Sequence, residues 1–148
     1  MPGAGDPTKA PSTPITGEHQ PANRRADIDA VESAVLEALD RCAYSESSRF
    51  AVRLALEEAL VNAFQHGHRG LPAETPLTVA YTVVPDEVTI AVTDQGPGFD
   101  PSGVPDPTDE ANIELPSGRG LMLIRAYMTS VTHDMGGRRV TMVYRKPR

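Results

Sequence analysis

The run Leu-Ala-Leu-Glu-Glu-Ala-Leu-Val-Asn-Ala occupies residues 54–63 and belongs to a longer segment that is apolar or small on almost every side. Such a segment is typical of a helix that is nearly buried. Glu58 and Asn62 are four residues apart, so they project from one face of this helix. A buried carboxylate and a buried amide need partners, because leaving them unpaired is costly. The two residues are therefore either a structural polar pair or part of a ligand site.

The helix around this run is expected over 46–66, with Ser45 as its N-cap and Gly67 as its end. A second, amphipathic helix is predicted upstream over 27–41. Its apolar positions recur at helical spacing and are Ile28, Val31, Val35 and Leu39.

Four strands and one short helix are predicted downstream. The first two strands cover 77–84 and 87–93, a helix follows over 120–128, and a second hairpin covers 130–135 and 138–144. This order predicts an α/β (α+β) two-layer sandwich, with helices packed on one face of a mixed, mostly antiparallel sheet.

The N-terminal residues 1–24 are rich in proline and poor in large apolar side chains. Such a segment buries too little surface to offset the entropy lost on ordering. We therefore assign 1–24 to a disordered tail and 25–146 to one folded domain. A weak strand pattern near 13–18 leaves open an edge strand within the tail.

Charge and composition exclude several classes of protein. The net charge of −6 and the pI of about 5.1 argue against direct binding of nucleic acid, which needs a basic surface. No apolar run approaches the roughly 20 residues of a membrane span, and the N-terminus lacks the apolar core of a signal peptide. Cys42 is the only cysteine, so no internal disulfide can form and a reducing, cytoplasmic location is expected.

Two glycine-containing turns supply further candidate ligands. In Asp-Gln-Gly-Pro-Gly-Phe (94–99), which follows a predicted strand, Asp94 could accept a hydrogen bond from an exocyclic amine. Its glycines would let the backbone approach a flat base, although an ordinary turn explains the pattern equally well. In Ser-Gly-Arg-Gly-Leu (117–121), Gly118 and Gly120 precede a predicted helix, whose N-terminus favours a phosphate.

The order of these three motifs resembles the ATP-binding fold shared by gyrase, chaperones and histidine kinases. The order is Glu-x-x-x-Asn on a helix, Asp-x-Gly-x-Gly after a strand, and Gly-x-Gly before a helix. The bacterial serine-protein kinase/anti-sigma factor branch is the more similar one, because the text at 98–101, 104–108 and 116–124 also matches it. The resemblance covers roughly 27–144.

The resemblance implies a role for each motif in binding Mg²⁺ and ATP. Asn62 would ligate Mg²⁺, Glu58 would act as general base, and Asp94 would accept a hydrogen bond from the adenine amine. Further residues would line the nucleotide site, and these are His66, Gly96, Gly98, Gly118, Arg119, Gly120 and Thr141. A packing role for His66, a surface role for Arg119 and a plain strand role for Thr141 remain open.

Two functions are compatible with these residues. The first is a serine/threonine protein kinase that phosphorylates a small anti-sigma-factor-antagonist-type partner, with Glu58 taking the proton from the attacking hydroxyl. The second is a module that binds a sigma factor or another partner in a nucleotide-dependent manner, without phosphotransfer. Glu58 favours the first, and the absence of Lys or Arg from residues 100–118 favours the second.

A sensor histidine kinase is disfavoured, since residues 1–44 do not supply a phosphoacceptor helical hairpin. The sequence leaves a homodimer open.

Overall fold

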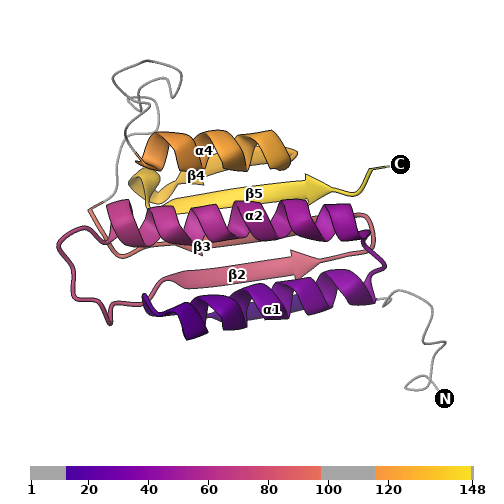
Figure 1. Cartoon of the computed structure of the whole chain (residues 1–148), viewed down its shortest axis with the longest axis horizontal. Helices are drawn as coiled ribbons and strands as arrows, with labels where there is room; N and C mark the ends of the chain where they lie inside the picture. The colour runs from indigo at the N-terminus through magenta and orange to yellow at the C-terminus, as the bar shows by residue number, and fades with distance from the viewer. Residues whose placement is uncertain (1–12, 98–115, 148) are drawn as a thin grey trace.

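The computed structural model describes residues 13–97 and 116–147, with residues 116–121 described by their backbone alone (Figure 1). The elements in chain order are β1 (Ile15–His19), α1 (Arg25–Arg41), α2 (Glu46–Asn62), the π-helical turn η2 (Ala63–Gly67), β2 (Thr78–Val83), β3 (Glu87–Thr93), α4 (Pro116–Tyr127), β4 (Ser130–Asp134), the 3₁₀ turn η4 (Met135–Gly137) and β5 (Arg139–Arg145).

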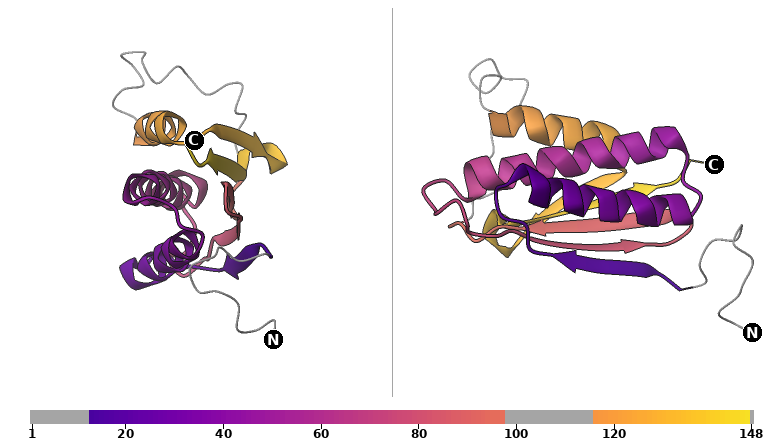
Figure 2. Two further views of the ribbon diagram at one scale, coloured as in Figure 1. Left: turned by 90° about the vertical axis from the view of Figure 1, so that its right-hand side faces the viewer. Right: turned by 60° about the horizontal axis from the view of Figure 1, so that its bottom comes forward.

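The strands form one sheet in the order β1-β2-β3-β5-β4, and the four pairings among the described residues are antiparallel. The helices α1, α2 and α4 cover one face of this sheet, as Figure 2 shows from two further directions. The predicted two-layer sandwich is therefore confirmed.

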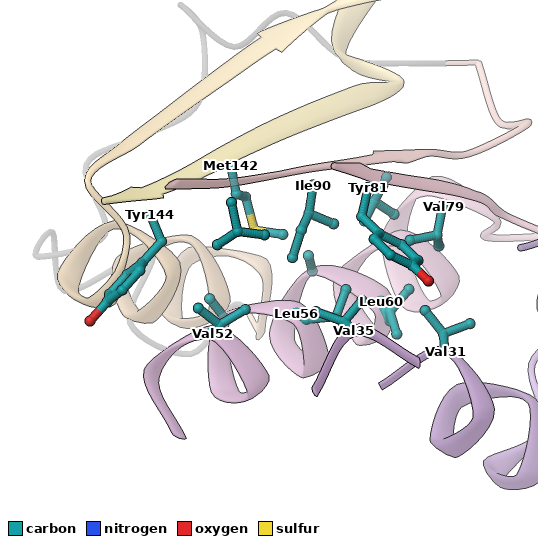
Figure 3. Close-up of a cluster of buried hydrophobic side chains, with 14 of the residues drawn as sticks. Val31, Val35, Val52, Leu56, Leu60, Val79, Tyr81, Ile90, Met142 and Tyr144 are labelled. Carbon is teal, nitrogen blue, oxygen red and sulfur yellow. The ribbon is translucent and has the colours of Figure 1, made fainter. Parts of the chain in front are cut away.

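The core lies between these two layers (Figure 3). Every second residue of β3 faces the helices, and Val88, Ile90 and Val92 are at most 1% exposed. Facing them, α2 contributes Leu56 and Leu60, which are both fully buried. Burying each such side chain stabilises the fold by about 1.5–3 kcal/mol, so packing of α2 on β3 holds the layers together.

The helix ends follow the predicted signals closely. The Ser45 side chain accepts a hydrogen bond from Ser48 N at 3.1 Å, which confirms the N-cap of α2. At its other end α2 continues into η2, where His68 N donates to Ala63 O over five residues at 2.8 Å. Such π-helical turns are rare and occur frequently at functional sites. No helix within 13–97 or 116–147 is long and apolar enough to cross a membrane.

An ordered strand lies within the range that we assigned to a tail. β1 pairs with β2 along Ile15–His19, so the open alternative of an edge strand applies to these residues. The ring of Tyr81 on β2 lies against Gly17, where a Cβ atom would overlap it, and stacks on His19 with centroids 5.9 Å apart. This contact needs a residue without a side chain on β1 and a partner strand more than 60 residues later in the sequence. For this reason the local strand pattern near 13–18 is weak.

A charged cluster joins α1 to α2. Glu32 is buried, and Arg25 and Arg53 approach its carboxylate at 3.6 and 3.5 Å. Arg25 also donates two hydrogen bonds to Glu57, at 2.9 and 2.7 Å. Burial raises the pKa of Glu32 to about 7, and the hydrogen bond from Arg25 lowers that of Glu57 to about 2. Glu32 therefore retains its proton toward neutral pH.

We expect Glu32→Gln to stabilise the protein relative to the parent above neutral pH and to leave stability nearly unchanged near pH 4.5. A carboxyl with a raised pKa in the folded state loses its stabilising contribution as the pH rises from its unfolded value through its folded value. The neutral amide has no such loss, so the difference should reach about 1–3 kcal/mol at pH 8. Urea unfolding at both pH values measures it. Glu37→Gln, an exposed change on the same helix, is the control, and a pH-independent difference for Glu32→Gln would contradict the expectation.

Candidate nucleotide-binding site

Three polar side chains follow one another at intervals of four residues where α2 passes into η2. Glu58, Asn62 and His66 are each half-buried. Asn62 Nδ2 and His66 Nε2 are fully covered, yet neither has a hydrogen-bond partner among the described residues. Buried polar atoms are nearly always paired, so this row is suited to a ligand that supplies the missing partners.

The surroundings of His66 favour the neutral form of its imidazole. Burial lowers its pKa, and the nearby Arg69 lowers it further. A neutral imidazole has one donor and one acceptor nitrogen, whereas the charged form has two donors. His66 can therefore either donate to or accept from a bound group without bringing a charge into the site.

The turn after β3 holds a buried carboxylate. Asp94 is 9% exposed, and its Oδ1 accepts a hydrogen bond from Gly96 N at 2.8 Å. Its backbone N donates to Arg138 O at 2.8 Å, which anchors the turn to the β4–β5 hairpin. Burial raises the pKa of Asp94, and the hydrogen bond from Gly96 partly offsets the rise. One carboxylate oxygen is thus occupied by the turn, and Oδ2 makes no hydrogen bond with the described residues.

Two glycines bring this turn against the end of η2. A Cβ atom at Gly67 would overlap the Asp94 carboxylate, and one at Gly96 would overlap the carbonyl oxygen of Gly67. Any side chain at either position would push the two segments apart. Gly67 therefore both ends the helical segment, as predicted, and joins the row on α2 to Asp94.

His68 is a residue of the site that the sequence did not identify. It is 6% exposed, and its Nε2 accepts a hydrogen bond from Gln95 N at 2.9 Å. Its ring lies edge-on to Phe64, with centroids 5.7 Å apart. Its contact is with a residue 27 positions later, which leaves no local signal in the sequence.

The Gly-x-Gly motif lies within a helix and not in a loop before one, which corrects our expectation. α4 begins at Pro116, so Gly118, Arg119 and Gly120 form part of its first turns. Proline is favoured at the first helical position, because the backbone N–H that it lacks has no intrahelical partner there. The N-terminus of α4 remains a candidate phosphate site, because the first N–H groups of any α-helix lack an intrahelical partner. It lies at the same end of the helical layer as the C-terminus of α2 (Figure 1).

Thr141 does not join the other predicted residues. Its neighbours Met142 and Tyr144 point toward the helices (Figure 3), so strand alternation places Thr141 on the opposite, helix-free face. There it pairs with Ala91 on β3 and Thr132 on β4. This placement favours the plain strand role for Thr141 that the sequence left open. Gly98, the other predicted pocket residue, lies outside the described residues.

The family of the chain follows from a comparison with known families. The family model of the histidine kinase-like ATPase domain matches residues 21–144, which is most of the chain. The chain belongs to the histidine kinase-like ATPase family. The matched residues include Glu58, Asn62 and His66 and the turn that carries Asp94. The resemblance inferred from the motifs is therefore confirmed.

A solved structure of the same fold is the crystal structure of the RsbU and RsbW domains of Rv1364c from Mycobacterium tuberculosis. It aligns with a TM-score of 0.60 and 18% sequence identity, over 93% of this chain and 33% of that chain. At this identity the likeness shows the fold alone. The present chain spans about a third of that protein chain. No curated protein matches the sequence.

The side chains of this histidine kinase-like ATPase domain fit a nucleotide with a hard cation. Mg²⁺ prefers oxygen ligands and keeps several waters, so the amide of Asn62 is a suitable ligand and Glu58 can hold a water. The carboxylate of Asp94 is a suitable acceptor for an exocyclic amine. The atom of Asn62 that lacks a partner among the described residues is Nδ2, a donor suited to a phosphate oxygen, whereas its Oδ1 is the atom that would ligate the cation.

Proposed function

We propose that this histidine kinase-like ATPase domain binds Mg²⁺-ATP and transfers the terminal phosphoryl group to a serine or threonine of a small anti-sigma-factor-antagonist-type partner. The observation that carries the proposal is the row of Glu58, Asn62 and His66, in which the buried Asn62 Nδ2 and His66 Nε2 lack hydrogen-bond partners among the described residues. A structural polar pair would be expected to satisfy its buried atoms internally.

Asp94 and the two glycines form the part that would select the base. Asp94 Oδ1 is occupied by Gly96 N, which leaves Oδ2 to accept from an exocyclic amine. The absence of a side chain at Gly96 lets the turn lie directly on Gly67. This contact fixes the carboxylate in place before a ligand arrives, so little ordering is required on binding.

Asn62 and Glu58 form the part that would act on the phosphates and on the attacking hydroxyl. Bound Mg²⁺ would neutralise charge on the phosphates, and Asn62 would be its protein ligand. Glu58 lies one helical turn before Asn62 and makes no hydrogen bond or ion pair with the described residues. Its carboxylate is therefore available to orient a serine or threonine hydroxyl and accept its proton.

A nucleotide-dependent partner-binding module is the second candidate. It is favoured by the sequence 100–118, which contains no Lys or Arg to stabilise charge on a transferring phosphoryl group. In this case Glu58 would hold a water, and the partner, such as a sigma factor, would be bound but not modified.

Label transfer distinguishes the two candidates. The protein is mixed with ATP labelled at the terminal phosphate, Mg²⁺ and antagonist-type domains encoded near its gene, and label on each partner is followed over time. Transfer to a serine or threonine supports the kinase. Stable binding of a partner and ATP without transfer replaces the kinase with the binding module, and the absence of ATP binding contradicts both.

Asn62→Ala should remove the dependence of ATP binding on Mg²⁺ and weaken binding in its presence by at least about tenfold. The amide has no other partner among the described residues, so its loss should leave the fold intact. Calorimetry with and without Mg²⁺ measures both effects. Gln65→Ala, an exposed change in η2, is the control. If ATP binding to Asn62→Ala responds to Mg²⁺ as the parent does, Asn62 is structural.

A further inference from the structure

We propose that His68 is a positioning residue that fixes the turn carrying Asp94 and thereby sets the preference of the site for adenine. The inference rests on the proposed nucleotide binding and adds a residue that acts through Asp94 without touching the base.

His68 connects the π-helical turn to the Asp94 turn at both its backbone and its side chain. Its N–H closes η2 on Ala63 O at 2.8 Å, which directs the side chain away from the α-helical path. Its Nε2 then accepts from Gln95 N at 2.9 Å. The edge-on contact with Phe64 holds the imidazole in this orientation. A regular α-helical end would place the residue differently, so the π turn is part of the arrangement.

The hydrogen bond from Gln95 determines which ring nitrogen of His68 carries the proton. Because Nε2 accepts a backbone N–H, the neutral ring must carry its hydrogen on Nδ1. Nδ1 is buried and has no partner among the described residues. The ring is therefore buried although only one of its two nitrogens has a hydrogen-bond partner among the described residues. The hydrogen bond that the buried ring does make with the described residues is the one that fixes the turn.

Two consecutive N–H groups of the turn are held by these contacts. Gln95 N donates to His68, and Gly96 N donates to Asp94 Oδ1. The Gln95 side chain adds a third tie, since its Nε2 donates to Pro76 O at 2.9 Å. Without the acceptor on His68, Gln95 N loses its partner and the peptide between Asp94 and Gly96 can rotate. The direction of Asp94 Oδ2 then varies, while the row on α2 keeps its geometry.

The test compares ATP with inosine triphosphate, which lacks the exocyclic amine but carries the same triphosphate. His68→Phe keeps an aromatic ring and removes the acceptor, His68→Asn shortens the side chain so that its amide oxygen no longer reaches Gln95 N, and His68→Gln places an amide oxygen near the position of Nε2. Calorimetry gives the affinity of each folded variant for both nucleotides, and hydrogen exchange of the Gln95 amide reports the contact without nucleotide.

We expect His68→Phe and His68→Asn to lower the affinity for ATP by about tenfold or more and to leave that for inosine triphosphate nearly unchanged. His68→Gln should restore both the ATP preference and the slow exchange of the Gln95 amide. Equal losses for both nucleotides, or an unchanged ATP preference in either His68→Phe or His68→Asn, would overturn the positioning role while leaving nucleotide binding intact. A parent that binds neither nucleotide would instead overturn the proposed function itself.

Discussion

Replacing Asp94 with asparagine is expected to abolish detectable ATP binding while leaving the protein folded. The substitution keeps an oxygen that can accept from Gly96 N. In the parent this hydrogen bond, with 2.8 Å between Gly96 N and Asp94 Oδ1, holds the turn. It replaces the other oxygen with an NH₂ group that cannot accept from an adenine amine. A hydrogen bond to a charged group contributes about 1.5–3 kcal/mol. In the variant the asparagine NH₂ faces the adenine amine, so both donors lack an acceptor, which adds to the loss. Together these effects should weaken binding by more than about 100-fold.

Calorimetry on Asp94→Asn measures this loss, and thermal unfolding verifies the fold. Asp86→Asn is the matched control, since Asp86 is an exposed aspartate between β2 and β3. If a folded Asp94→Asn protein binds ATP as tightly as the parent, the carboxylate does not recognise adenine and the base pocket lies elsewhere.

Glu58→Ala is expected to stop phosphoryl transfer while leaving ATP and partner binding largely intact. The carboxylate makes no hydrogen bond or ion pair with the described residues, so its removal should not disturb α2. A positioned base contributes about 10²–10⁴-fold to a rate, and the rate of label transfer should fall by that factor. The effect differs in kind from that of Asn62→Ala, which should weaken binding itself.

The control for Glu58→Ala has to be a carboxylate on the same helix without a structural role. Glu57 is the neighbour in sequence, but its two hydrogen bonds with Arg25 tie α1 to α2. Glu46, which is exposed in the first turn of α2, is more suitable, and Glu46→Ala should transfer phosphate at the parental rate. Transfer at the parental rate by Glu58→Ala would show that the protein is a kinase whose base is another group.

Local patterns were sufficient to predict the main elements of the fold. Alternation of apolar residues placed β3 at Glu87–Thr93, and the predicted bounds agree with the observed ones. The N-cap at Ser45 likewise predicted the start of α2. Both signals could be recognised because they depend only on neighbours within a few residues. The motif residues Glu58, Asn62 and Asp94 were singled out from local spacing and family resemblance, and their roles in the site remain predictions.

The remaining parts of the site depend on contacts between distant segments. The role of His68 comes from a hydrogen bond to Gln95, and the need for glycine at positions 67 and 96 comes from the approach of two turns. The face on which Thr141 lies is set by the register of β5 against β3, which a one-residue shift would reverse. None of these relations has a signature within a single stretch of sequence.

The first strand bears on how the domain should be delimited for laboratory work. The family match begins at residue 21, after β1 has ended at His19. A fragment cut at that boundary would lose the strand that pairs with β2 from Thr78 to Val83, and the backbone amides and carbonyls along that side would become an open sheet edge. Open edges recruit strands from other molecules, so self-association of such a fragment would report its truncation and not the behaviour of the domain. Fragments for study should therefore begin before Ile15.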